Sequence, residues 1–152
     1  MNGSAGRRAC ASILGVALLC ACHSPAAVRE PRSADLPAFL LGDFMDDYGG
    51  RFTISATEWV QHPTNRYRIV KWNVSAQYLI AQNDAANASA PGLWTRIDWL
   101  QLPARAPYTW GFCFTAYEAR SATEAEVTTS AQRDTPRTGC NGFPFSRMRS
   151  AR

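Results

Sequence analysis

The sequence predicts a mainly β protein with one short helix, built as a small antiparallel meander or barrel of about 5–6 strands. Two observations carry this prediction. Short runs rich in β-branched and aromatic residues recur between residues 51 and 117. The gaps between them are too short for a helical crossover, so neighbouring strands are expected to pair antiparallel. Such a meander has to close into a barrel or be covered on one face, because open strand edges pair with other chains.

The first clear strand is residues 51–57, where Phe52, Ile54 and Ala56 alternate with polar residues. This period of two is typical of a half-buried strand. Further strands are expected at residues 66–74, 77–81, 93–102 and 108–117, and residues 39–48 hold a short sixth candidate. Residues 61–65 and 83–92 carry the Pro, Asn and Gly that favour turns and loops.

The pattern changes after the last strand. Ser121 and Glu124 fit a helix capping box, which predicts one short C-terminal helix ending at about Gln132. The last strand places a heavy aromatic face on one side and Cys113 on the other. Apart from the three cysteines in or next to the leader, only Cys113 and Cys140 remain, and two cysteines in an exported domain predict one disulfide. That bond would clamp the C-terminal tail over the second face of the sheet.

The chain begins with Arg7 and Arg8 and no acid, followed by an apolar run at residues 9–21. A membrane-spanning helix needs about 20 apolar residues. The shorter run behind a positive start predicts a signal peptide.

The run ends in Leu19, Cys20, Ala21 and Cys22, which resembles the bacterial lipobox. The resemblance implies that Cys22 receives a diacylglycerol on its sulfur, is further acylated with chains such as palmitate, and becomes the first mature residue. Residue 23 is His and not Asp, which by the same resemblance implies the outer membrane, with the domain in the periplasm or at the cell surface. The alternative is an ordinary secretory signal with incidental cysteines.

Four regions are therefore expected: a lipoprotein signal peptide at 1–21, the lipidated Cys22 and a flexible tether at 22–38, one β-rich domain at 39–147, and a basic tail at 148–152. The formal net charge of +4 includes Arg7 and Arg8, and 4 − 2 leaves +2 for the mature protein. A near-neutral domain does not indicate a nucleic-acid partner.

Few residues offer chemistry for catalysis. The histidines are His23 in the tether and His62 in a turn, which is poor support for a zinc site or a triad. No phosphate-cradling Gly loop is present. Asp43, Asp46 and Asp47 could hold calcium, but a solvated turn explains them more simply. The expectation is a protein that is not an enzyme, with no catalytic residue, metal or cofactor.

Arg96 and Asp98 lie two positions apart on one expected strand and so share a face with apolar neighbours. The pair either orients a polar ligand or forms a structural salt bridge, and the structural interpretation is favoured. The five tryptophans could line a pocket, although aromatic residues of this kind are more often core.

Gly42, Asp43 and Phe44 resemble the opening of small lipocalin-like (calycin) barrels, with Phe44 where that family has Trp. More broadly, residues 46–49, 94–99, 112–113 and 139–144 resemble uncharacterised bacterial lipoproteins, a family from which no activity carries over.

The expected function is that of a membrane-anchored bacterial lipoprotein with a non-catalytic binding or envelope-interaction domain. With so few strands the barrel interior is expected to be filled by side chains. The binding surface would then be the loop at 83–92 or the turn at 43–48, and the partner another envelope protein. The alternative is a lipocalin-like carrier of a small apolar ligand.

Overall fold

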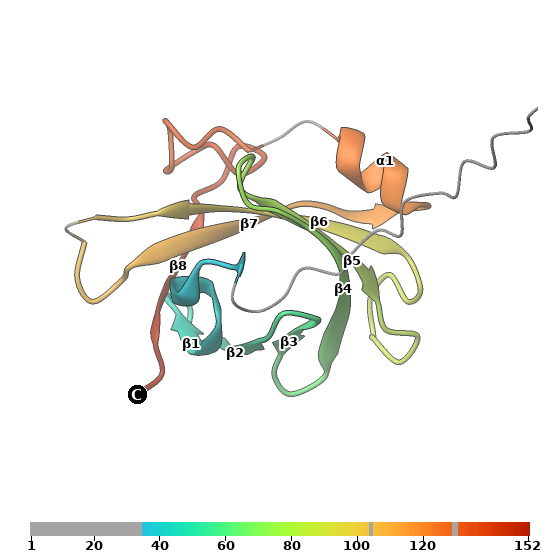
Figure 1. The fold of residues 1–152 in the computed structure, drawn as a ribbon, viewed down its shortest axis with the longest axis horizontal. Helices are drawn as coiled ribbons and strands as arrows, with labels where there is room; N and C mark the ends of the chain where they lie inside the picture. Colours follow the sequence, from blue (N-terminus) through green and yellow to red (C-terminus); the bar gives the residue numbers. More distant parts are fainter. Residues whose placement is uncertain (1–34, 104, 129–130) are drawn as a thin grey trace, which may run out of the picture.

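The computed structural model describes residues 35–103, 105–128 and 131–152. The expected signal peptide, Cys22 and most of the expected tether lie outside the described residues. The described chain forms a closed antiparallel barrel of eight strands (Figure 1). In chain order the strands are β1 (Gly42–Asp46), β2 (Arg51–Ile54), β3 (Glu58–Gln61), β4 (Asn65–Asn73), β5 (Tyr78–Asn83), β6 (Trp94–Gln101), β7 (Trp110–Ala119) and β8 (Ser146–Ser150).

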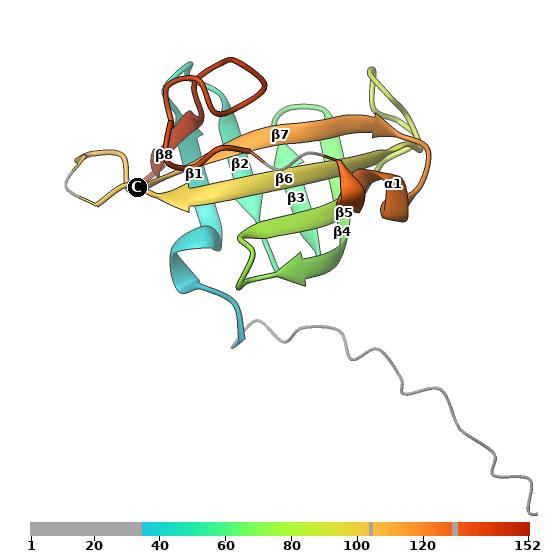
Figure 2. The ribbon, with the colours of Figure 1, turned by 90° about the horizontal axis from the view of Figure 1, so that it is seen from above.

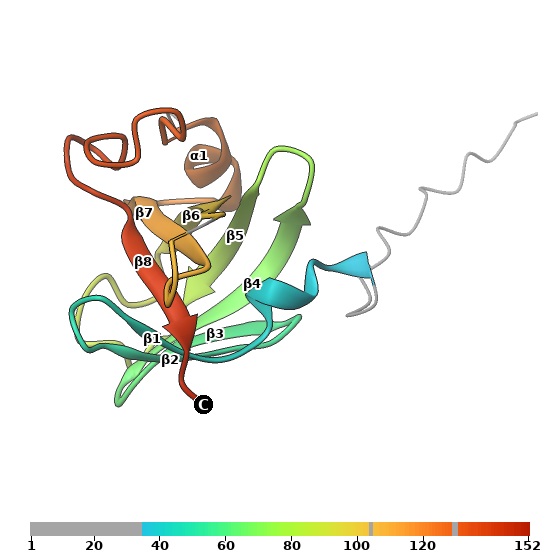
Figure 3. The same cartoon turned by 90° about the vertical axis from the view of Figure 1, so that its left-hand side faces the viewer.

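The barrel is an up-and-down meander in which each strand pairs with the next along the chain. β8 closes it by pairing with both β7 and β1, with Met148 opposite Trp110 on one side and Asp46 on the other. Figure 3 shows β8 lying across the seam beside β1. Each described strand is therefore paired on both sides over at least part of its length, which limits the strand edge that another chain could pair with. The mainly β prediction is confirmed.

The predicted number of strands was too low, because β3 and β8 were not recognised. β3 has only four residues, and its Trp59 and Val60 are both buried, so it shows no alternation. β8 was taken as part of a basic tail at 148–152. Its Arg147 and Arg149 flank a single fully buried apolar residue, Met148.

The barrel interior is filled by side chains, mostly aromatic rings. Trp59 contacts both Trp110 and Phe112 edge to face, with ring centroids 6.1 and 5.1 Å apart, and the Trp110 and Phe112 rings are tilted at 6.4 Å. A short 3-10 helix, Ala38–Leu40, adds Leu40 to this core and brings Phe39 to within 6.5 Å of Trp110. The segment that leads in from the tether thus packs against the barrel core.

The outer face of β5, β6 and β7 is covered by a second layer (Figures 1 and 2). Helix α1 (Ala122–Val127) packs its buried Ala125 against Tyr78 and Ile80 of β5. Residues 131–145 cover the other half of the face, where Phe145 packs with Leu100 and Cys113.

Helix α1 starts where the sequence predicted. Ser121 accepts a hydrogen bond from the Glu124 backbone N–H at 3.1 Å. The helix is shorter than predicted, because Thr128 is already extended (ψ 144°) and ends it. Among the described helices, none has the length and apolar character needed to cross a membrane.

Candidate functional site

A groove of about 830 Å³ lies outside the barrel and is here called the outer groove. Its walls come from three places: the β1–β2 turn, the loop after β6, and the segment that runs from α1 to β8. The turn contributes Asp47 and Tyr48, so the predicted 43–48 surface forms one wall. The opposite wall, residues 134–138, was not predicted.

The floor of the outer groove is apolar. Leu102 and Phe145 are almost fully buried and belong to the cluster that packs on the outer face of the sheet. Pro136 and Pro144 lie beside them, and Tyr48 stands at the edge with 74% of its surface exposed. Proline and packed core side chains lose little freedom on binding, so this floor is preorganised.

The segment that forms the far wall is held by covalent and polar contacts. Cys113 and Cys140 form a disulfide with a Cα–Cα distance of 5.5 Å, which confirms the predicted pairing. The side-chain amide of Asn141 donates to the backbone carbonyl of Phe114 at 3.2 Å. Asn141 and Gly142 both have positive φ, as a tight turn requires, and the turn leaves Phe143 71% exposed.

Three arginines stand around the groove. Arg147 donates to the Asp47 carboxylate at 2.8 Å and lies 4.8 Å from the Tyr108 ring, and the hydrogen bond with Asp47 raises the pKa of Arg147. Arg105 and Arg137 are exposed and have no ion pair within residues 35–103, 105–128 and 131–152. Asp134 also lines the groove, so the three arginines stand against two aspartates and the rim has an excess of one positive charge.

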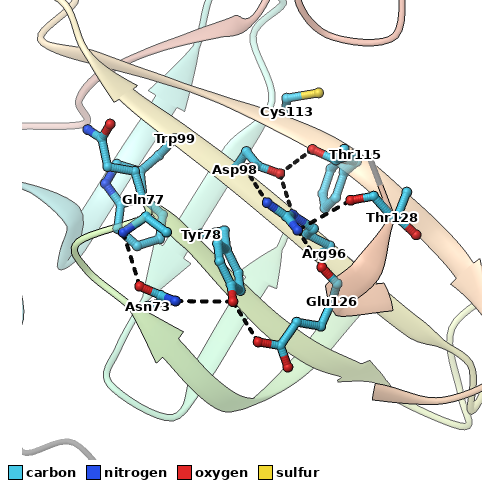
Figure 4. A network of polar contacts seen from close by, with 12 residues as sticks. Asn73, Gln77, Tyr78, Arg96, Asp98, Trp99, Cys113, Thr115, Glu126 and Thr128 are labelled. Carbon is cyan, nitrogen blue, oxygen red and sulfur yellow. Dashed lines mark hydrogen bonds and ion pairs between the residues drawn. The ribbon is translucent and has the colours of Figure 1, made fainter. Parts of the chain in front are cut away.

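Arg96 and Asp98 lie elsewhere, under the outer layer (Figure 4). Both are buried, as predicted, and Arg96 donates to the Asp98 carboxylate through Nε at 2.8 Å and a terminal nitrogen at 3.0 Å. Thr115 Oγ1 and Arg133 also donate to this carboxylate, at 2.5 and 2.7 Å. Arg133 is a partner that the sequence analysis missed, because it is remote in sequence.

The remaining donors of Arg96 face backbone. Its other terminal nitrogen donates to the carbonyls of Glu126 and Thr128, at 2.6 and 3.3 Å, and its guanidinium lies 4.1 Å from the centre of the Tyr78 ring. Every nitrogen of Arg96 and both oxygens of Asp98 therefore have a partner within the protein. These contacts favour the structural salt bridge over the ligand-facing alternative.

Another charged group lies where helix α1 meets the outer face of β4 and β5. Glu126 accepts from Lys71 and, at 2.6 Å, from the Tyr78 hydroxyl. The hydrogen bond from Lys71, followed by that from Tyr78, lowers the pKa of Glu126, and the same contact raises the pKa of Lys71. Lys71 and Glu126 are partly exposed, whereas Tyr78 is buried, and together they connect α1 to β4 and β5.

The three aspartates considered for calcium point to different partners. Asp46 accepts from the backbone N–H groups of Tyr48 and Gly50, whereas Asp43 accepts from the Thr53 hydroxyl and Asp47 pairs with Arg147. Within the part of the chain that the structure describes, no three His, Cys, Asp or Glu side chains gather as a metal site would need.

His62 lies 2.9 Å from the Thr53 hydroxyl, which itself donates to Asp43. The Thr53 hydroxyl has one proton, and this proton is donated to the Asp43 carboxylate. His62 must therefore donate to the Thr53 oxygen, whereas a base that activates a nucleophile accepts the proton of the nucleophile. These exposed residues therefore form a surface hydrogen-bond chain without an activated nucleophile.

The tryptophans are mainly core residues, in agreement with the favoured interpretation. Trp59 and Trp110 are almost fully buried in the barrel, and their indole N–H groups have no hydrogen-bond partner among the described atoms. Trp72 is half buried, and its indole donates to the Ala56 carbonyl at 2.7 Å.

Comparisons of the chain with protein-family models, curated proteins and solved structures found no match.

Proposed function

We propose that this protein is a lipid-anchored, non-catalytic binding protein of the bacterial envelope. Its outer groove holds an extended, acidic segment of another envelope protein. The observation that carries the proposal is the groove itself, an apolar floor beside two arginines that have no acidic partner in the described chain.

The shape of the groove supports an extended segment. A volume of about 830 Å³ spread between a turn, a loop and a long irregular segment suits several consecutive residues better than one compact ligand. Its floor offers Leu102 and Phe145 to apolar side chains. Buried apolar anchors of this kind supply most of the affinity in protein interfaces.

The charge around the groove supports an acidic partner. Asp47 pairs with Arg147, so the remaining charges of the rim are the two positive charges of Arg105 and Arg137 and the one negative charge of Asp134. Arginine forms paired hydrogen bonds with carboxylates, so acidic side chains of the partner complement this rim. Complementary charge chiefly sets specificity and the rate of encounter.

The alternative, a lipocalin-like carrier of a small apolar ligand, keeps the support of the eight-stranded closed barrel. Against it stands the packing of the interior. The space in which such a ligand would lie is occupied by core side chains, namely those of Trp59, Trp110, Phe112, Phe52 and Leu79. The outer groove is therefore the better supported site.

The envelope location rests on the lipobox-like stretch that ends in Cys22. Anchoring by two or more acyl chains is stable, because each buried methylene contributes about 0.8 kcal/mol. The tether at 22–38 would then connect the anchor to the barrel.

The test is a binding titration with three fluorescein-labelled peptides, in which Leu alternates with Asp, Asn or Lys. The Asp peptide is expected to bind about tenfold more tightly than the Asn peptide, since two exposed charge pairs contribute up to about 1 kcal/mol each. The Lys peptide should bind most weakly. Raising the salt concentration should reduce the differences.

Two double variants localise the effect. Arg105→Ala/Arg137→Ala is expected to abolish the preference for the Asp peptide. The matched control is Arg66→Ala/Arg68→Ala, which removes two exposed arginines from β4 and should leave the preference intact. Equal binding of the three peptides, or a preference that survives loss of Arg105 and Arg137, would contradict the proposal.

A further inference from the structure

A second hollow, of about 290 Å³, lies at the end of the barrel where the β3–β4 and β5–β6 connections meet, and is here called the mouth pocket. Its floor is the outermost ring layer of the core. Tyr67 and Phe114 face it with ring centroids 5.6 Å apart and planes tilted by 37°. Phe114 rests in turn on Trp59, at 6.3 Å, so the pocket lies beyond the filled interior.

The rim of the mouth pocket combines a further ring with free polar groups. Tyr117 of β7 is 53% exposed and lines the hollow. The side chains of Gln61, Tyr67, Ser89 and Tyr117 have no hydrogen-bond partner among the described residues. No charged residue lines the pocket.

The loop that forms one wall is held in place. Asn83 is buried and donates to the carbonyls of Ala90 and Tyr117, at 2.9 and 3.1 Å, while accepting from Thr95 at 2.6 Å. Asn87 bonds both backbone groups of Arg66, each at 2.8 Å. The wall is therefore ordered before any ligand arrives, which favours binding.

One position in that wall is strained. Ala90 has a φ of 49°, in the left-handed region that an alanine rarely adopts. The bond that its carbonyl accepts from Asn83 accompanies this conformation. Strained residues held by their surroundings occur preferentially at binding sites.

We propose that the mouth pocket binds one neutral sugar ring. The apolar face of a pyranose would lie against Tyr117 and the rings of the floor, and its hydroxyls would pair with Gln61 and Ser89. The absence of a lining charge disfavours an ionic ligand. A wholly apolar ligand would leave hydroxyl and amide groups desolvated without partners, which is unfavourable.

The site is independent of the outer groove, and its test uses the soluble mature domain from residue 23 onward. Methyl β-D-glucopyranoside and methyl β-D-galactopyranoside are titrated to about 50 mM, enough to detect a dissociation constant of about 1 mM, or roughly −4 kcal/mol. At least one glycoside is expected to shift the backbone amide signals of Tyr67, Ser89 and Phe114. The signals of the outer groove should stay in place.

Two variants make the test specific. Tyr117→Ala, at an exposed position whose side chain makes no hydrogen bond in the described structure, is expected to weaken binding about tenfold. Tyr48→Ala, which removes an exposed tyrosine from the outer groove, is the matched control and should bind as wild type does. The far-ultraviolet circular dichroism of both variants should match wild type.

The proposal fails if neither glycoside produces shifts at the mouth pocket, or if Tyr117→Ala binds as tightly as Tyr48→Ala. A titration with 1-hexanol gives the third outcome. Shifts at the mouth pocket with hexanol and none with the glycosides would replace the sugar with an apolar ligand. Each of these results leaves the peptide titration of the outer groove unaffected.

Discussion

Arg133 donates a hydrogen bond to the Asp98 carboxylate at 2.7 Å and so ties the segment that follows α1 to the middle of β6. The same guanidinium donates to the backbone carbonyls of Trp99 and Gln77, at 2.8 and 2.7 Å. The Asp98 carboxylate also accepts hydrogen bonds from Arg96 and Thr115. This single carboxylate therefore connects β6, β7 and the start of the far wall of the outer groove.

Replacing this carboxylate should therefore destabilise the protein strongly. Asp98→Ala is expected to lower the free energy of unfolding by about 3–5 kcal/mol, because it leaves the buried Arg96 without its counter-charge. Arg96→Ala should cost less, since Arg133 and Thr115 still contact Asp98. Urea unfolding of the soluble domain measures both.

The control is Glu58→Ala, which breaks the ion pair between Glu58 and Arg66. The side chain of Glu58 is 43% exposed and that of Arg66 is 54% exposed. Its effect should be at most about 1 kcal/mol. If Asp98→Ala were as mild as Glu58→Ala, the buried network would not be what holds the outer layer.

The disulfide should contribute a comparable amount. Cys113 and Cys140 are separated by 27 residues. Closing a loop of this length in the unfolded chain is worth about 3.5 kcal/mol in the chain-entropy description. The double variant Cys113→Ala/Cys140→Ala should lose about this much in urea unfolding. A loss below about 1 kcal/mol would show that the segment is held in place without the bond.

Stability should fall in acid partly through Glu126. Lys71 and Tyr78 hold the pKa of this carboxylate below its usual value of 4.5 in the folded protein. Its contribution is therefore fully present above that pH and is lost as the pH falls through the folded value. Glu126→Gln should flatten the acid side of the stability curve, by at most about 1 kcal/mol because the pair is partly exposed. Identical acid profiles for variant and wild type would argue against this role.

Membrane attachment should depend on Cys22. Cells given a labelled fatty acid are expected to incorporate the label into wild type and not into Cys22→Ala, because the lipobox resemblance assigns the acyl chains to this residue. The wild-type protein should fractionate with membranes. Label that persists in the variant, or a wild type found wholly in the soluble fraction, would sink the lipoprotein interpretation.

Parts of the fold were predictable because their signals are local. The alternation around Phe52 and Ile54 and the Ser121 cap each lie in a short stretch of chain. The disulfide was predictable because Cys113 and Cys140 are the two cysteines that lie far from the N-terminal apolar run. β8 gives no such signal. Its sequence, Ser-Arg-Met-Arg-Ser, becomes a strand because Met148 enters a core that already contains Trp110 and Phe44.

The outer groove was only half predictable for the same reason. The turn with Asp47 and Tyr48 was expected to be a surface of interest, but its opposite wall is brought there by the Cys113–Cys140 bond and by Arg133. The mouth pocket beside loop 83–92 was also only partly predictable. The loop was recognised, but its neighbours Tyr67 and Phe114 come together only when the barrel closes.

The most direct test of the central claim is to map the binding of the Asp–Leu peptide on the ¹⁵N-labelled domain by NMR. Amide signals of Tyr48, Leu102, Arg137 and Phe145 are expected to shift. The indole N–H signals of Trp59 and Trp110, which report on the barrel interior, should remain unchanged. Shifts confined to those two indoles, with none in the outer groove, would contradict the account and place the ligand inside the barrel.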